Sequence, residues 1–218
     1  MRRSAWPPRF LAATAWLIGV RQRREGMRIG PHSLLVANHT SWLDIIVLAG
    51  ATGCAFVAKD ELGSGFLHWL ADQNATVYVK RAHVRGAMDQ AIAIARALGG
   101  TKPIALFPEG TTGPGTDLLP FRSTLLEAAK YADKAVEIRP VAIEYGAAAR
   151  EVGWWEESGK DNLLRILGRR GTLPVTVKLL APLDRALDRK ALAQAARSAI
   201  AQSLDLTSSP HSPIGGEK

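Results

Sequence analysis

The chain has 218 residues, of which 47% are hydrophobic, and this length and composition predict a single domain around one substantial core. Its lone cysteine, Cys54, has no partner for a disulfide or a cysteine-rich metal site, which favours a reducing, cytoplasmic setting and argues against zinc. The net charge of +8 is concentrated at the amino end, where residues 1–30 contain seven arginines and one glutamate. A basic end beside an apolar segment indicates an anionic membrane surface as a partner and argues against nucleic acid.

The first predicted element is the apolar segment Phe10–Val20. It is too short to cross a hydrocarbon core of ~30 Å, which requires about 20 helical residues. Arginines follow it in place of a small-residue cleavage site, which argues against a secretory signal. We therefore predict that residues 1–24 form a short amphipathic membrane-surface helix, with Trp6 and Trp16 as interfacial anchors. The alternative is a helix that covers the sheet, and both interpretations can hold for different faces.

The stretch from Ser33 to Asp44 is typical of a short strand that ends in polar residues, followed by a helix from about Ser41. His39 and Asp44 on one ideal helix would point about 140° apart, at roughly 100° per residue. We therefore expect His39 to lie outside the helix and to fold back onto Asp44 in its first turn. A carboxylate fixes the tautomer of an imidazole and raises its basicity, so this pair can take a proton from a hydroxyl. A capping box from Ser41 to Asp44 is the alternative role for the carboxylate.

The rest of the chain alternates between the two kinds of element. Strands are predicted at 54–58, 75–79, 103–107, 136–144 and 173–180, helices at 65–73, 84–98, 124–133 and 188–204, an excursion with a short helix at 147–170, and a loose tail at 207–218. This alternation predicts an α/β fold over residues 25–206, with a mostly parallel central sheet and helices on both faces. Polar stretches at 38–44, 80–81 and 109–112 each follow a predicted strand, so we expect them to share a cleft at one edge of the sheet.

Four sequence blocks in this order resemble a known family. They are Asn38–Asp44 (NHTSWLD), Val77–Arg81 (VYVKR), Phe107–Thr111 (FPEGT) and Arg139–Val141 (RPV). Together they resemble the membrane glycerolipid acyltransferases typified by 1-acylglycerol-3-phosphate acyltransferase. The resemblance covers about half of the chain, and the first and third blocks in the correct order are its most specific part.

The resemblance implies transfer of a fatty acyl chain from acyl-CoA or acyl carrier protein to the free hydroxyl of a lysolipid, first of all 1-acylglycerol-3-phosphate, giving phosphatidic acid. It implies that His39 is the general base and that Asp44 holds it. It also implies an acceptor site at Arg81, Glu109, Gly110 and Thr111. No metal and no cofactor beyond the acyl carrier is expected, and the expected location is the cytoplasmic face of the inner membrane.

The third block departs from the family pattern. It reads Glu-Gly-Thr-Thr from Glu109 to Thr112, where the family commonly has Glu-Gly-Thr-Arg, so a second cationic group is missing. This departure is similar to relatives that acylate lyso-ornithine lipid, which is therefore the alternative acceptor. Because the Glu109 carboxylate would repel a phosphate, we expect it to position Arg81 or an acceptor hydroxyl.

Two further alternatives remain open. The basic amino end is also compatible with a non-catalytic protein that binds membranes. Trp154 and Trp155, followed by four aliphatic residues at 163–167, are either a second membrane-facing surface or ordinary packing.

Overall fold

The computed structural model describes residues 6–59, 77–79, 86–132 and 135–206. The strands of this described part form one seven-stranded sheet in the order β1-β7-β6-β2-β5-β3-β4. They are β1 (Val20–Glu25), β2 (Ser33–Ala37), β3 (Ala55–Lys59), β4 (Val77–Val79), β5 (Ile104–Leu106), β6 (Glu137–Glu144) and β7 (Leu173–Leu179). All neighbours pair in parallel except β6 and β7, which are antiparallel. The predicted mostly parallel sheet is confirmed.

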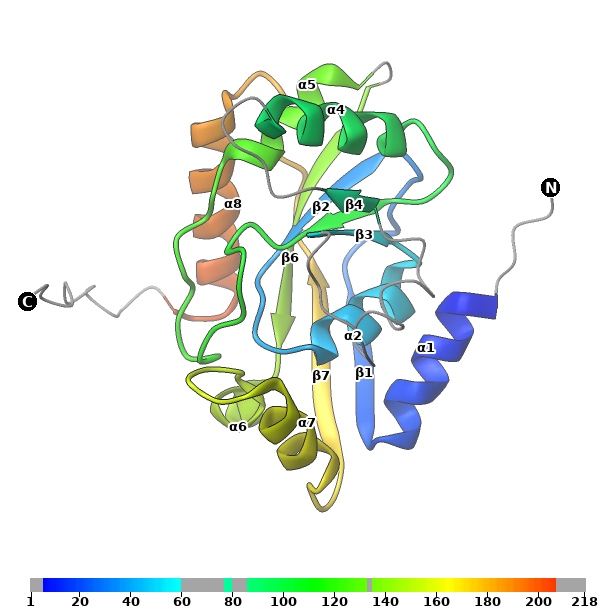
Figure 1. The fold of residues 1–218 in the computed structure, drawn as a ribbon, viewed down its shortest axis with the longest axis vertical. Helices are drawn as coiled ribbons and strands as arrows, with labels where there is room; N and C mark the ends of the chain where they lie inside the picture. Colours follow the sequence, from blue (N-terminus) through cyan, green and yellow to red (C-terminus); the bar gives the residue numbers. More distant parts are fainter. Residues whose placement is uncertain (1–5, 60–76, 80–85, 133–134, 207–218) are drawn as a thin grey trace, which may run out of the picture.

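Helices cover both faces of this sheet, as predicted (Figure 1). They are α1 (Trp6–Leu17), α2 (Leu43–Thr52), α4 (Gly86–Leu98), α5 (Ala128–Tyr131), α6 (Ala149–Val152), α7 (Gly159–Leu167) and α8 (Arg189–Ser203), with short 3-10 turns η1 (Thr124–Glu127) and η2 (Gly146–Ala148). The helix predicted at 65–73 and the tail predicted at 207–218 lie outside the described residues.

Strand β2 packs against helices on both faces of the sheet. Alternate side chains of a strand point to opposite faces, so Leu35 and Ala37 join a core with α1 and α2, while Leu34 and Val36 join one with α4, α5 and α8. Both sets are fully buried. A strand buried on both faces has a continuous apolar sequence, which explains why β2 was found correctly from sequence.

The amino-terminal segment differs from the prediction in its second half. Helix α1 ends at Leu17, and residues 20–24, which we had assigned to the same surface helix, belong to the edge strand β1. Gly19 makes the turn between them with a φ of 88°, a conformation that glycine adopts readily. Long charged side chains are well suited to an edge strand because they face solvent and discourage pairing with another chain.

Helix α1 itself has two different faces. Leu11 and Ala15 are buried against α2, so the alternative of a helix covering the sheet is confirmed for that face. Trp16 and Leu17 remain exposed, and their contact with a membrane stays a prediction. Among the described residues, no helix has both the length and the apolar character needed to span a bilayer.

Candidate active site

His39 and Asp44 meet at the carboxyl end of β2. His39 lies in the turn between β2 and α2, and its Nδ1 is 2.9 Å from Asp44 Oδ2 in the first turn of α2. The expected folding back of His39 onto Asp44 is therefore confirmed. The Asp44 side chain is fully buried, whereas that of His39 is 16% exposed. Within the described ranges Nε2 has no hydrogen-bond partner, so this ring nitrogen is available to a substrate.

Asp44 is held by three further donors. Its Oδ2 also accepts the backbone N–H groups of Thr40 at 2.6 Å and Ser41 at 2.9 Å, and its Oδ1 accepts the hydroxyl of Tyr145 at 2.6 Å. An ionised carboxylate satisfies all of these contacts, because it can only accept. In a capping box, a carboxylate accepts the backbone N–H of the residue three positions before it, as Asp44 does with Ser41. Asp44 Oδ2 therefore both closes the turn and orients the His39 ring.

Tyr145 is a site residue that our sequence reasoning missed. It directly follows β6, at the same edge of the sheet as His39, and this position after a strand was the available signal. Burial, together with the nearby Asp44 charge, raises the pKa of Tyr145 well above its usual value. Its hydroxyl therefore stays protonated and can only donate to Asp44.

Glu109 holds the backbone of His39. Its Oε1 accepts the His39 N–H at 2.7 Å, and its Oε2 accepts the N–H of Leu119 at 2.9 Å. Burial raises the pKa of Glu109 to about 7, although the two backbone N–H groups oppose this rise. A hydrogen bond from His39 to Glu109 therefore connects the first sequence block with the third. Arg81, the predicted partner of Glu109, lies outside the described residues, and its role stays a prediction.

Two more side chains fix the position of His39. The ring of Phe107 stacks on the imidazole with a centroid separation of 4.0 Å and an interplanar angle of 12°. The side-chain amide of Asn38 donates to the Ile143 carbonyl at 3.1 Å and accepts the Ile143 N–H at 2.8 Å, which extends the pairing of β2 with β6. Both residues belong to sequence blocks that we quoted, but we had assigned neither a role.

The guanidinium of Arg122 lies close to Gly110 in the third sequence block. The φ of Gly110 is 75°, and a Cβ placed on this glycine would lie 3.4 Å from the guanidinium carbon of Arg122. Arg122 is exposed, and the described part of the chain offers it no ion-pair partner. Thr112 stands where the family commonly has its second cationic residue. Arg122, ten residues after Thr112, provides a positive charge beside the third block instead.

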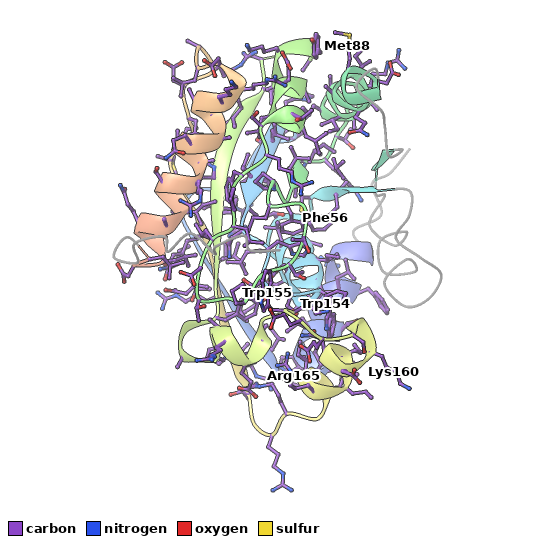
Figure 2. All side chains as sticks on the ribbon, turned by 60° about the vertical axis from the view of Figure 1, so that its left-hand side comes forward. Phe56, Met88, Trp154, Trp155, Lys160 and Arg165 are labelled. Carbon is purple, nitrogen blue, oxygen red and sulfur yellow. The ribbon has the colours of Figure 1, made fainter. Side chains whose placement is uncertain are left out.

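His39 borders two pockets. One, of about 300 Å³, also contains Glu109 and the charged residues Asp117, Glu144 and Arg150. The other, of about 470 Å³, is lined by Thr111, Thr112 and the residues 154–157. Figure 2 shows Trp154 and Trp155 at this second pocket, above α7. Two separate pockets therefore adjoin His39. No group of His, Cys, Asp and Glu in the described residues could hold a metal ion.

Comparisons with known proteins identify the family of this chain. Residues 20–144 match the family model described as Acyltransferase. The chain belongs to the acyltransferase family. This acyltransferase is 33% identical over 195 residues to the lyso-ornithine lipid O-acyltransferase of Rhodobacter capsulatus, covering 84% of this chain and 70% of that relative.

Other relatives have a different acceptor in their names. The 1-acyl-sn-glycerol-3-phosphate acyltransferase of Neisseria gonorrhoeae is 33% identical over 132 residues, which are 60% of this chain and 48% of that protein. The crystal structure of the 1-acyl-sn-glycerophosphate acyltransferase PlsC from Thermotoga maritima shares the fold, with a TM-score of 0.63 and 23% identity over 94% of this chain and 80% of that chain. The predicted family is confirmed, and with it acyl transfer in lipid biosynthesis.

Proposed function

We propose that this acyltransferase esterifies the free hydroxyl of a single-chain lipid from an acyl thioester, with His39 as the general base. The observation that carries the proposal is the contact of His39 Nδ1 with the buried Asp44, which leaves Nε2 without a partner in the described residues on a side chain that lines both pockets. Nε2 takes the hydroxyl proton as the hydroxyl oxygen attacks the thioester carbonyl. The tetrahedral intermediate then loses its C–S bond, and the imidazolium returns the proton to the departing thiolate of coenzyme A or acyl carrier protein.

The surrounding residues keep the imidazole in one orientation. Asp44 stabilises the imidazolium that forms, and Tyr145 holds Asp44. Glu109 fixes the backbone of His39, and Phe107 restricts its ring by stacking. General base catalysis contributes roughly 10²–10⁴-fold to such a reaction, and the two pockets contribute by holding the reactants close together.

We favour lyso-ornithine lipid as the acceptor. The ornithine head group of such a lipid carries one carboxylate and one ammonium, and the pocket beside His39 presents charges of both signs. Asp117 and Arg150 line it, and neither has an ion-pair partner in the described residues. A phosphate with two negative charges would meet the carboxylate of Asp117 there, whereas Glu144 is already paired with Lys178 at 3.0 Å. Relatives in four organisms named lyso-ornithine lipid O-acyltransferase, each 33–35% identical, support this order of the two acceptors.

The acceptor that the sequence resemblance put first, 1-acylglycerol-3-phosphate, is the second candidate. It is favoured by Arg122, whose guanidinium lies beside Gly110 and can grip a phosphate with two parallel hydrogen bonds. For either acceptor, we propose that the protein works on the cytoplasmic face of the membrane. The arginines of residues 1–30 and the exposed Trp16 support attachment to an anionic surface.

The test measures product formation by the purified chain. Labelled acyl-CoA or acyl carrier protein is supplied with lyso-ornithine lipid or lysophosphatidic acid, and we expect faster turnover of lyso-ornithine lipid. His39→Ala should lose at least about 100-fold in turnover. His32→Ala is the matched control, because His32 precedes the amino end of β2, at the opposite end of the strand from His39. Full turnover by His39→Ala would refute the general base, and a wild type that acylates neither lipid would refute the function.

A further inference from the structure

The segment around α7 exposes large apolar side chains beside the second pocket. Trp155, Leu164 and Leu167 are 45%, 57% and 49% exposed. Leu164 and Leu167 share one face of α7, whereas Ile166 packs into the core on the other face. An isolated exposed leucine requires no explanation, but a helix with one buried and one exposed apolar face does.

Trp154 anchors this segment to the body of the protein, because its backbone N–H donates to the Thr40 carbonyl at 2.9 Å and its side chain packs against the core. Its indole N–H donates to the Glu157 carbonyl at 3.1 Å, and its ring lies so close to Gly159 that a Cβ there would be only 2.8 Å away. Arg165 is joined to Glu157 and donates to the Gly153 carbonyl at 2.9 Å. The loop from residue 153 to α7 is therefore fixed in place. Trp155 points outward from a supported loop, and it lines the same pocket as His39.

The exposed end of α1 lies on the same side of the molecule. The backbone N–H of Leu173, the first residue of β7, donates to the carbonyl of Gly19 at 2.9 Å, so the turn after α1 adjoins the turn between α7 and β7. Trp16 and Leu17, two of the most exposed apolar side chains, immediately precede that turn. In Figure 1, this end of α1, helix α7 and the carboxyl end of β6 all lie in the lower part of the molecule. The exposed apolar residues of both helices therefore belong to the same end of the molecule, where Trp155 lines the second pocket.

The charges near these side chains suit an anionic lipid surface. Arg21 stacks over the Trp16 ring at 5.0 Å, and Arg23 and Arg24 follow it. Lys160 lies four residues before Leu164, and Arg170 lies three residues after Leu167, both exposed. Of the acidic side chains near α7, Glu157 and Asp161 are engaged by Arg165 and Ser158, which leaves Glu156 as the exposed acid next to Trp155. Aromatic and aliphatic side chains interspersed with free basic groups are typical of surfaces that insert between lipid head groups.

We propose that Trp155, Leu164 and Leu167 form a second membrane contact, which inserts into an anionic bilayer and holds the His39 pockets against its surface. This α7 contact acts together with the exposed end of α1. A lysolipid would then move from the bilayer into the site without crossing water. The contact is separate from the acyl transfer chemistry, so it can be tested on vesicles that contain neither substrate.

The first experiment measures binding of the full chain to vesicles of phosphatidylethanolamine with phosphatidylglycerol. We expect the double variant Leu164→Ser, Leu167→Ser to bind at least about tenfold more weakly than the wild type, because two large apolar groups no longer leave water. Met88→Ser is the matched control. Met88 is 57% exposed, as is Leu164, but it lies on α4 at the opposite end of the molecule (Figure 2). Equal binding by the wild type and the double variant would overturn the proposal.

The second experiment tests whether position 164 enters the bilayer, in a chain that keeps Trp155 and Leu167. A polarity-sensitive fluorophore is attached through Leu164→Cys or, as the control, through Met88→Cys. The native thiol will not compete, because burial raises the pKa of Cys54 to about 12. Anionic vesicles should shift the emission of the probe at 164 to the blue and leave the probe at 88 unchanged. A probe at 164 that stays in water with bound protein, or a wild-type dimer that the double variant abolishes, would refute membrane insertion by α7.

Discussion

The buried carboxyl of Glu109 should make the stability of this protein depend on pH near neutrality. Burial raises its pKa from 4.5 to about 7. The folded chain therefore keeps a proton on Glu109 over this range, while the unfolded chain has released it. Because the folded state binds more protons, the contribution of Glu109 to the free energy of unfolding should be highest below about pH 4.5 and fall as the pH rises towards 7. Above about pH 7 both states are ionised, and this contribution becomes constant.

The size of the effect follows from the difference in proton affinity. A pKa that rises from 4.5 to about 7 corresponds to a loss of about 3 kcal/mol across the window, with a slope of at most about 1.4 kcal/mol per pH unit. Solvent screening reduces this value little, since Glu109 is only 3% exposed. The loss is a large part of the ~5–15 kcal/mol by which domains are stable.

Urea unfolding of the wild type and of Glu109→Gln at pH 5, 6, 7 and 8 tests this reasoning. The glutamine does not titrate, so the difference in unfolding free energy between the two proteins should change by about 2–3 kcal/mol between pH 5 and 8. Effects of other titrating groups cancel in that difference. Glu151→Gln is the control, because Arg169 lowers the pKa of Glu151 and leaves it ionised throughout this range. A difference between wild type and Glu109→Gln that is the same at all four pH values would refute the assignment.

Two substitutions test how His39 and its pocket are held. Tyr145→Phe removes the donor at 2.6 Å from Asp44 Oδ1. A hydrogen bond to a charged group contributes about 1.5–3 kcal/mol, so we expect kcat to fall about 10- to 150-fold with little change in KM. An unchanged kcat would show that Asp44 does not depend on this donor. Gly115→Ala should lower the unfolding temperature and the activity, because its Cβ would lie 2.3 Å from the Ala149 carbonyl oxygen at a φ of 80°. Gly146→Ala also has a positive φ but meets nothing within 4 Å, so thermal unfolding should show a clearly smaller loss, and equal losses would contradict the steric argument.

The part of the site that could be predicted from sequence is the part that is local in sequence. His39 and Asp44 are five residues apart, and the geometry of a strand followed by a helix was sufficient to bring them together. Glu109 contacts His39 from 70 residues away, and Tyr145 contacts Asp44 from 101 residues away. The sequence placed Glu109 at the shared edge of the sheet but did not single out Tyr145, and either hydrogen bond requires the register of β5 and β6 against β2. That register is set by packing of the whole sheet.

Strand β1 was missed for a related reason. Its sequence, VRQRRE, contains only one apolar residue, so it lacks the alternation that identifies a half-buried strand. The strand forms because β7 offers it a partner, with Val20 opposite Leu173 and Glu25 opposite Lys178. The apolar residues before it were assigned correctly to a helix, but their continuation into Val20 hid the turn at Gly19.

The direction of β7 connects the catalytic site with the proposed membrane contact. All other neighbouring strands in the described sheet are parallel, and a parallel β7 would require the chain to return to the amino end of β6. Because β7 is antiparallel to β6, residues 145–172 stay at the carboxyl end, where His39 lies. This arrangement allows Tyr145 to reach Asp44 and places Trp155 and α7 at the mouth of the second pocket. A single reversed strand thus brings Tyr145, which holds Asp44, and the exposed apolar face of α7 to the same end of the protein.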